Sequence, residues 1–300
     1  MIASILPADW PFRDASRFMQ AGGVNWHVQR VGSGPAILMI HGTAASTHSF
    51  RALATRLADD FELVMADLPG HGFSGPLDAP TLPRNASAMG ALTRALGVEP
   101  ALVVGHSAGA AIALRMALDG ACSPSVIVGL APALKPYGGA ADGLASGLAK
   151  LAFINPITPR FVAMRASPAR VKRLIERTGS HIDEAGCTLY KRLLERPSHV
   201  SGALKMMANW RLRPTLDALP RLAVRFVAVA GDADRATPER DIVQAVQPIP
   251  DHDTVVLQGL GHLAHEEDPD AVAAVIRREV QRAGFFDPAS QDQGRLNAVR

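Results

Sequence analysis

Cysteine is scarce in this chain of 300 residues. Cys122 and Cys187 are far apart in the sequence, and neither belongs to a Cys-x-x-Cys pair or to a mixed cysteine and histidine pattern. Two isolated thiols exclude the disulfide framework of a small secreted protein, and they do not indicate a structural zinc site. A reducing cytoplasm fits this cysteine content best.

Long hydrophobic runs are also missing. The apolar segment at the start of the chain is interrupted by Pro7 and Asp9 and has no basic residue before it, so we expect no signal peptide. The longest stretch without Lys, Arg, Asp or Glu, residues 31–50, is broken by Gly, Pro, His, Ser and Thr. It does not have the continuous apolar character of a membrane-spanning helix. The sequence therefore predicts a cytoplasmic protein.

Charged residues make up 20% of the chain and aromatic residues 5%, whereas 48% of the residues are hydrophobic. This balance excludes intrinsic disorder and a collagen-like chain, and it allows a large buried core. The 26 glycines and 22 prolines indicate many tight connections. The length allows one large domain or two smaller ones.

Charge is unevenly distributed along the chain. Residues 132–217 contain 14 Lys and Arg against 6 Asp and Glu, whereas the remainder contains 17 against 22. A basic segment on an acidic body is typical of a site for an anionic ligand or an anionic membrane surface. A solvated helical face explains the same pattern, and the sequence does not decide between these interpretations.

Short apolar runs of strand length recur along the chain and are separated by helical patterns. Most of these runs are apolar throughout, as in strands that are buried on both faces of a parallel sheet. Asp268 and Pro269 have the positions of an N-cap and a first helical residue, and we expect their helix to end near Gly284. The predicted strands are 36–40, 61–66, 101–104, 125–130, 224–230 and 254–257. The fold class is thus α/β, a mostly parallel doubly wound sheet.

The alternation of strands and helices stops in residues 135–213, which are rich in Leu, Ala, Met and Arg in helical patterns. We interpret this segment as a helical cap inserted into the sheet domain. The two parts of the core are then 1–134 and 214–286. Residues 287–300 are polar and have no periodicity, so they are expected to form a flexible tail.

The segment Gly105-His106-Ser107-Ala108-Gly109 follows a predicted strand directly and leads into an Ala-rich helix. A nucleophile on a sharp strand-to-helix turn points into a pocket, and small flanking residues allow strand and helix to approach closely. This context predicts that Ser107 is a catalytic nucleophile. The alternative is a Gly-rich turn with an incidental serine.

A serine hydroxyl needs a base to accept its proton and an acid to orient that base. Asp234 lies in the loop after the run 225–230, and His262 follows glycines after the run 254–257. The order Ser, Asp, His after successive parallel strands can bring all three to one sheet edge. Asp232 and His265 are the alternatives, and we prefer Asp234 and His262.

The negative oxygen that forms during attack on a carbonyl needs preorganised N–H donors. Ala108, directly after the nucleophile, and Thr43, in the loop after the first buried strand, have the positions of such an oxyanion hole. His41 and His106 stand beside these positions and are candidates for contact with substrate. Asp67 and His71 have no metal-binding spacing to another ligand, so we expect no metal and no cofactor.

Several motifs together resemble the α/β-hydrolase superfamily over about residues 25–283. They are His41-Gly42, Asp67-Leu-Pro-Gly-His-Gly72, Gly105-His-Ser-Ala-Gly109, Gly231-x-x-Asp234 and Gly261-His262. More narrowly, Asp9-Trp-Pro, Trp26-His-Val-Gln-Arg, the segment 41–49 and the segment 103–120 resemble the magnesium-chelatase accessory proteins of bacteriochlorophyll synthesis. The resemblance implies a role near the insertion of magnesium into protoporphyrin, with a magnesium-chelatase subunit as a partner.

Serine at the nucleophile position disfavours dehalogenases and epoxide hydrolases, which resemble this outline but usually have aspartate there. Epoxide hydrolases also tend to use paired cap tyrosines, whereas the only tyrosines here are Tyr137 and Tyr190. Hydrolysis of an ester, thioester, amide or carbon–carbon bond stays open.

The cap would define the substrate. Its apolar candidates are Phe153, Phe161, Met164, Met206, Met207 and Trp210, and its basic candidates are Arg160, Arg165, Lys205, Arg211 and Arg213. This mixture suits a flat apolar ring that bears carboxylates, such as a porphyrin. Methionines and aromatic residues at helical spacing are, however, more often part of a core.

Three functions remain compatible with these patterns. The first is a serine hydrolase that acts in bacteriochlorophyll synthesis, the second a non-catalytic porphyrin-binding accessory or carrier protein, and the third a general carboxylesterase. Residues 140–157 have the pattern of a weakly amphipathic helix, which is either a lid or a peripheral contact with the photosynthetic membrane. No motif for nucleic-acid binding accompanies the basic residues.

Overall fold

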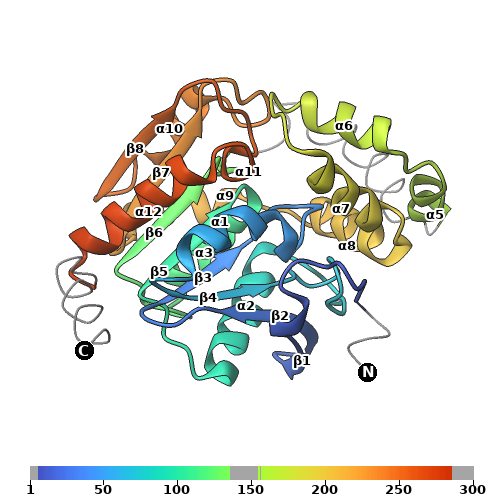
Figure 1. Cartoon of the computed structure of the whole chain (residues 1–300). Helices are drawn as coiled ribbons and strands as arrows, with labels where there is room; N and C mark the ends of the chain where they lie inside the picture. The colour runs from blue at the N-terminus through green and yellow to red at the C-terminus, as the bar shows by residue number, and fades with distance from the viewer. Residues whose placement is uncertain (1–5, 136–154, 156, 286–300) are drawn as a thin grey trace, which may run out of the picture.

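The computed structural model describes residues 6–135, 155 and 157–285, and it is built around an eight-stranded sheet (Figure 1). The strand order is β1-β2-β4-β3-β5-β6-β7-β8. The strands are β1 (Ser16–Ala21), β2 (Val24–Val31), β3 (Ala36–Ile40), β4 (Glu62–Ala66), β5 (Leu102–His106), β6 (Val126–Leu130), β7 (Arg225–Gly231) and β8 (His252–Leu257). From β4 to β8 all neighbouring strands are parallel. The α/β class and the mostly parallel sheet predicted from the sequence are confirmed.

The first two strands are the antiparallel part of the sheet. β1 and β2 form a hairpin through Gly22 and Gly23, whose positive φ angles of 54° and 79° suit a tight turn, and β2 pairs antiparallel with β4. The sequence did not predict β1, because this edge strand has mostly exposed or half-buried residues and no apolar run. The predicted strands in the parallel part agree with the observed ones to within two residues at each end.

Helices cover both faces of the sheet and bury two apolar layers. On one face, α1 (Arg51–Leu57) and α12 (Pro269–Arg282) pack against each other and against the sheet. On the other face, α2 (Leu82–Leu96), α3 (Ala108–Leu118) and α10 (Glu239–Val246) cover a second cluster (Figure 1). Burial of the strand runs on both faces explains why they are apolar throughout.

The start of α12 follows the prediction from the sequence. The Asp268 side chain accepts a hydrogen bond from the backbone N–H of Ala271 over 2.9 Å, and Pro269 is the first helical residue. The helix ends at Arg282, two residues before Gly284. Short helices also occur in the described part of the core: the 3₁₀ helices η2 (Arg13–Ala15), η3 (Thr47–Phe50) and η4 (Leu219–Arg221), and the α-helix α11 (Ala264–Glu267).

Between β6 and β7 most of the described residues are helical. The helices are α5 (Ile157–Met164), α6 (Pro168–Glu176), α7 (Glu184–Leu194), α8 (Pro197–Ala208) and α9 (Arg213–Leu216). We call residues 157–216 the helical insertion. Ser167 and Asp183 cap α6 and α7 with side-chain hydrogen bonds, and α5 to α8 lie together to one side of the sheet (Figure 1).

Some predictions concern residues outside the described part of the chain. They include the flexible tail 287–300, Tyr137, Phe153 and nearly all of the amphipathic segment 140–157. Among the residues that the structure describes, no helix is both long enough and apolar enough to span a membrane.

Candidate active site

Ser107 occupies a sharp turn between β5 and α3. Its φ and ψ angles are 52° and −114°, which a non-glycine residue rarely adopts. The turn is held by hydrogen bonds from the Ser107 N–H to the Leu130 carbonyl, over 2.9 Å, and from the Ala133 N–H to the Ser107 carbonyl, over 3.2 Å. The end of β6 thus stabilises a strained backbone at the residue that the sequence predicts as nucleophile.

The glycines around Ser107 allow α3 to approach the sheet. A Cβ atom on Gly105 would lie 2.6 Å from the Cα atom of Ala110, and one on Gly109 would lie 2.1 Å from the Ile40 carbonyl oxygen. Both contacts are too short for a side chain, so only glycine fits at these two positions. This close approach explains why the turn has small residues on both sides of the serine.

His262 and Asp234 come together after β8 and β7. His262 Nδ1 lies 2.9 Å from Asp234 Oδ2, and the aspartate side chain is fully buried. Because the carboxylate can only accept, the proton is assigned to Nδ1, which leaves Nε2 of His262 as an acceptor. Ser107 and His262 line the same cavity, but the hydrogen bonds among the described residues do not include one between them. Such catalytic contacts are often long before substrate binds.

The loop after β7 holds Asp234 firmly. Its Oδ1 accepts hydrogen bonds from the N–H groups of Ala236 and Thr237, over 2.7 and 2.9 Å. Burial raises the pKa of Asp234, but the hydrogen bonds from His262 and Thr237 outweigh it and hold the pKa below its ordinary value. The carboxylate is therefore charged and can orient His262 near neutral pH.

Thr237 is a site residue that was not predicted from the sequence. Its hydroxyl donates to Asp234 Oδ2 over 2.6 Å, and its Oγ1 atom also lies 3.2 Å from His262 Nδ1. The signal was its place three residues after Asp234 and directly before Pro238, where a hydroxyl can bond back to the aspartate in a turn.

Asp232 and His265, the two alternatives that the sequence left open, have other roles. Asp232 Oδ1 accepts the Gly259 N–H over 2.6 Å and so holds the loop after β8. His265 is fully buried against Phe50 and His106, and its ring nitrogens have no partner in the described part of the chain. Burial lowers the pKa of His265 to about 3, so it stays neutral. The geometry thus favours Asp234 and His262.

His106 and His41 support the site in different ways. His106 lines the cavity, and its Nε2 donates to the backbone carbonyl of His262 over 3.0 Å. Burial lowers the pKa of His106 well below its ordinary value, so the ring is neutral. His41 is buried and accepts the Leu68 N–H at Nε2 over 2.8 Å, which places it among the loops behind the cavity. His41 therefore positions loops and does not line the cavity.

The cavity beside Ser107 has a volume of about 210 Å³. The carboxyl edge of the sheet and the helical insertion both contribute to it, so the insertion covers the site. Its lining comprises Thr43, Ala44, Ala45, His106, Ser107, Val171, Leu174, Ile175, Thr178, Tyr190, Leu194, His262 and Leu263. No Lys, Arg, Asp or Glu belongs to this lining in the described residues, and α6 and α7 give it an apolar wall.

Tyr190 of the lining connects α7 to the core. Its hydroxyl donates to Glu266 Oε1 over 2.8 Å, and the Glu266 carboxylate pairs with Arg51. Arg51 also lies 2.6 Å from Asp183 at the start of α7. Burial raises the pKa of Glu266 to about 7, although Arg51 and Tyr190 act in the opposite direction. This group of four residues joins the insertion to the segment that carries His262.

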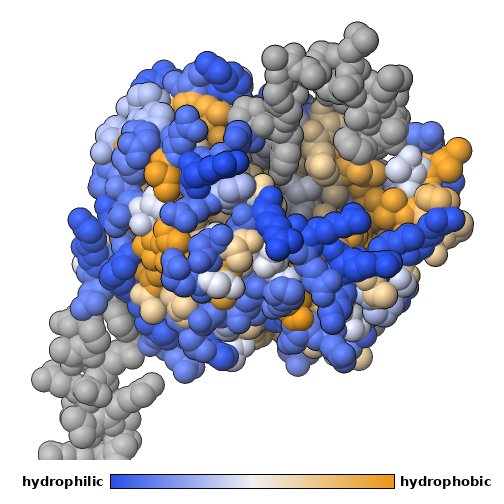
Figure 2. Space-filling view, turned by 90° about the horizontal axis from the view of Figure 1, so that it is seen from above, coloured by the Kyte–Doolittle hydropathy of each residue, from blue (hydrophilic) through white to orange (hydrophobic). Residues whose placement is uncertain are grey.

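Most of the apolar residues predicted to contact substrate lie elsewhere. Met206 is 0% exposed and belongs to the core cluster, and Trp210 packs against the same cluster. Met164 and Met207 are 79% and 43% exposed. Figure 2 shows apolar surface on the side of the molecule that the helical insertion occupies in Figure 1. These four residues do not line the cavity, because helical spacing shows that a helix has an apolar face but not what covers that face.

The predicted basic contacts are also absent from the cavity lining. Arg165 stacks over the ring of Phe161 on α5, 4.6 Å from its centroid, and Arg213 pairs with Asp217. Arg160, Lys205 and Arg211 likewise do not line the cavity. Within residues 6–135, 155 and 157–285, no three His, Cys, Asp or Glu side chains are grouped so that they could hold a metal ion.

Residues 37–275 match the alpha/beta hydrolase family. The chain belongs to the α/β-hydrolase family. A magnesium-chelatase 30 kDa subunit from Rhodobacter capsulatus is 39% identical to it over 279 residues, which are 90% of this chain and 96% of the relative. A pimeloyl-[acyl-carrier protein] methyl ester esterase from Xanthomonas oryzae pv. oryzae is 29% identical over 282 residues, which are 85% of this chain and 98% of the relative. The family predicted from the motifs is therefore confirmed.

Solved structures of this family have the same fold at low sequence identity. A thermophilic esterase from Thermogutta terrifontis has a TM-score of 0.73 at 19% identity, with 89% of this chain and 98% of that chain covered. The epoxide hydrolase CorEH has a TM-score of 0.75 at 19% identity, with the same coverage. Because both activities occur on one fold, the fold does not choose between them.

Proposed function

We propose that this α/β-hydrolase is a serine hydrolase that cleaves an ester through an acyl-enzyme. Ser107 is the nucleophile, His262 the general base and acid, and Asp234 the residue that orients His262. The observation that carries the proposal is the hydrogen bond between His262 and Asp234 beside a strained serine turn. A merely structural turn would not need a buried, charged carboxylate behind a histidine in the same cavity.

The reaction has two steps. Ser107 Oγ attacks the ester carbonyl carbon while His262 Nε2 takes the hydroxyl proton, and the tetrahedral intermediate collapses when His262 returns that proton to the departing alcohol. Water then gives a proton to His262 and attacks the acyl-enzyme. The second intermediate collapses when His262 passes that proton to Ser107 Oγ, which releases the carboxylic acid and restores Ser107. Asp234 stabilises the imidazolium that forms in each step.

The oxyanion of both intermediates would be held by the backbone N–H groups of Thr43 and Ala108. Ala108 is the first residue of α3, so its N–H has no acceptor within the helix and lies at the positive end of the helix dipole. Thr43 lines the cavity in the loop after β3. Hydrogen-bond donors of this kind contribute roughly 3 kcal/mol each to the transition state.

The cavity lining supports an uncharged apolar acyl group. Val171, Leu174 and Ile175 of α6 face the same cavity as Ser107, and no cation of the described residues lines it. A carboxylate-bearing ring seated directly on Ser107 would find no cationic partner among the residues that the structure describes. If the substrate is a large anionic ester, its charged part lies outside this cavity and only its acyl or methyl-ester end reaches the serine.

A fluorophosphonate probe tests the proposal without knowledge of the substrate. The wild-type protein should be labelled rapidly, Ser107→Ala not at all, and Asp232→Asn at close to the wild-type rate. A folded wild-type protein that stays unlabelled, or a labelled Ser107→Ala variant, would contradict the proposal.

A second candidate function follows from the relative that is named as a magnesium-chelatase subunit. In that case the chain acts beside a magnesium chelatase, as an enzyme or as a carrier that binds a porphyrin without turnover. Pigment intermediates should be compared in Rhodobacter capsulatus cells that lack their own 30 kDa subunit and express the wild type, Ser107→Ala or no protein. Rescue by the wild type alone supports chemistry, whereas equal rescue by Ser107→Ala supports the carrier.

A further inference from the structure

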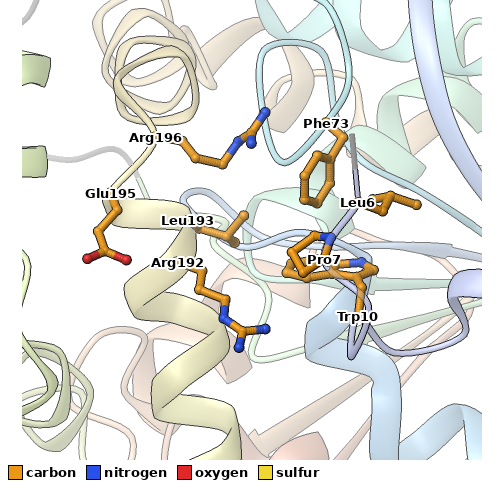
Figure 3. Close-up of a pocket in the computed structure, with 8 residues that line it drawn as sticks. All are labelled: Leu6, Pro7, Trp10, Phe73, Arg192, Leu193, Glu195 and Arg196. Atoms are coloured by element: carbon orange, nitrogen blue, oxygen red, sulfur yellow. The ribbon is translucent and has the colours of Figure 1, made fainter. Parts of the chain in front are cut away.

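A second cavity lies between the N-terminal segment and the end of α7 (Figure 3). Its volume is about 310 Å³, which is within the range of small-molecule sites. It shares no lining residue with the Ser107 cavity. The lining consists of Leu6, Pro7, Trp10, Phe73, Arg192, Leu193, Glu195 and Arg196.

The aromatic wall of this second cavity is well ordered by its own contacts. Trp10 packs edge-on against Phe73, with ring centroids 4.9 Å apart, and is 3% exposed. Its indole N–H is buried and has no acceptor among the described residues. The two rings therefore form a fixed apolar wall against which a flat group can stack.

Arg196 is the polar group that packs on the aromatic wall. Its guanidinium stacks over the ring of Phe73, 4.4 Å from the centroid (Figure 3). Within the described residues it forms no ion pair, and its Nε–H is buried without an acceptor. Stacking uses the face of a guanidinium and leaves the N–H groups at its edge for a planar anion.

The other charges around the second cavity are already paired. Arg192 binds the carboxylate of Asp9 through both terminal nitrogens, over 2.7 and 2.8 Å. Glu195 pairs with Lys191 and points away from Phe73 in Figure 3. Each pair is neutral, so the net positive charge of the described lining comes from Arg196.

One buried carboxylate, Asp67, also acts on Arg196 through space. Its oxygens accept hydrogen bonds from His27 and from the N–H groups of Thr47 and Phe73, and none comes from Arg196. Arg196 is therefore the cation that stays available to a ligand.

We propose that this second cavity binds a small carboxylate with an apolar, flat body. The carboxylate would accept from the edge of the Arg196 guanidinium, because two parallel N–H groups match its two oxygens. The body would lie against Trp10, Phe73, Leu6 and Leu193. The site does not depend on the proposed ester hydrolysis, since none of its residues belongs to the Ser107 cavity.

Two structural links connect the second cavity to the first. Leu193 and Leu194 are neighbours on α7 and line the second and the first cavity, respectively. Trp10 also contacts His48, whose ring packs edge-on against Tyr190 of the first cavity, 4.5 Å away. A ligand that holds Trp10 and Arg196 in place would therefore also restrict α7 above Ser107.

Calorimetric titration of the full chain with sodium benzoate tests the proposal, with benzamide as the neutral analogue of the same shape. We expect benzoate to bind at one site and benzamide to bind about tenfold more weakly or worse, because it lacks the charge that Arg196 pairs with. Arg196→Gln should weaken benzoate binding by a similar factor. Arg213→Gln is the matched control, because Arg213 is an exposed arginine of the same insertion with its own partner.

A second readout locates the ligand and does not require any arginine variant to fold. In ¹H–¹⁵N spectra of the wild type, assigned through Trp10→Phe, benzoate should shift the indole signal of Trp10 and leave that of Trp210 in place. Four results would each overturn the proposal: no benzoate binding, equal binding of benzamide, equal binding of inorganic phosphate, or an unmoved Trp10 signal. Unchanged benzoate binding by folded Arg196→Gln would overturn it as well.

Discussion

The carboxyl edge of the parallel sheet and the helical insertion both line the cavity beside Ser107, but they do so with different chemistry. The sheet edge supplies polar side chains, of which Asp234 is fixed by the N–H groups of its own loop and His262 by Asp234. The insertion supplies an apolar wall, with residues such as Val171 and Ile175. The proposed mechanism thus assigns reactivity to the sheet edge and the shape of the acyl site to the insertion.

The two regions also differ in what determines the direction in which their side chains point. A residue directly after a buried parallel strand must emerge at the carboxyl edge, whichever loop follows. A residue on a helix can face the core, the site or solvent, depending on a rotation of the helix that tertiary packing decides. Met206 and Met207 are neighbours on α8, and one is in the core while the other is exposed.

The largest effect should come from Ser107→Ala. If the sheet edge alone carries reactivity, turnover of p-nitrophenyl butyrate falls by about five orders of magnitude, as for other serine nucleophiles. The free energy of unfolding should change by less than about 1 kcal/mol, because the substitution removes one hydroxyl oxygen that accepts no hydrogen bond from a described side chain. Steady-state kinetics and urea unfolding measure the two quantities. A loss below tenfold would mean that Ser107 is not the nucleophile.

Asp234→Asn should lower turnover by about 10⁴-fold, because an amide can stabilise neither the imidazolium nor the required tautomer of His262. Asp232→Asn is the matched control in the same loop, since Asp232 only holds the Gly259 N–H. We expect the control to retain turnover within about tenfold. Equal losses in the two variants would show that loop stability, not the charge of Asp234, explains the effect.

Met206→Ala and Met207→Ala test the other side of the comparison. Met206→Ala should lower the free energy of unfolding by about 2–5 kcal/mol, because it leaves a cavity in the core, whereas Met207→Ala should change it by about 0.5 kcal/mol or less. Neither substitution should alter the preference among p-nitrophenyl esters of different acyl length. A changed preference in Met207→Ala would show that Met207 contacts the substrate.

Glu266→Gln tests the link between the two regions. The pKa of Glu266 is raised from 4.5 to about 7 in the folded state, so the folded protein holds this proton where the unfolded chain has lost it. The stability from this group is complete below about pH 4.5 and is lost as the pH rises through 7, by on the order of 3 kcal/mol. Glu266→Gln has no proton to lose and should remove that decline.

Urea unfolding at pH 5 and pH 8 measures the effect of Glu266→Gln. The variant should gain stability relative to the wild type as the pH rises. Glu184→Gln removes an exposed carboxyl group from α7, and its stability should depend on pH in the same way as that of the wild type. Parallel curves for Glu266→Gln as well would mean that the Glu266 carboxyl does not carry this proton.

Much of the sheet and the serine turn could be predicted from the sequence because both depend on local signals. Buried parallel strands are apolar throughout. Gly105 and Gly109 are required because a Cβ atom at either position would lie 2.6 Å or less from a neighbouring backbone atom. The strand β1 could not be predicted, since it lies at an edge and has no apolar run. Thr237 was not predicted either, although its turn position after Asp234 is a local signal.

The residues that line the two cavities from the insertion were largely beyond prediction. Tyr190 lines the Ser107 cavity and bonds to Glu266, 76 positions away in the sequence, and Arg196 lines the second cavity and stacks on Phe73, 123 positions away. Basic residues of the insertion therefore looked alike in the sequence. Only packing distinguishes Arg196, which stacks on Phe73, from Arg213, which pairs with its own helical neighbour.

The most direct test of the account is to identify the acylated residue during ester turnover. The wild-type protein would be mixed with p-nitrophenyl butyrate, quenched in acid within the first turnover and mapped by peptide mass spectrometry. The account predicts a single butyryl group on Ser107, which disappears as turnover ends. Hydrolysis without an acylated serine, or a butyryl group on another residue, would contradict it.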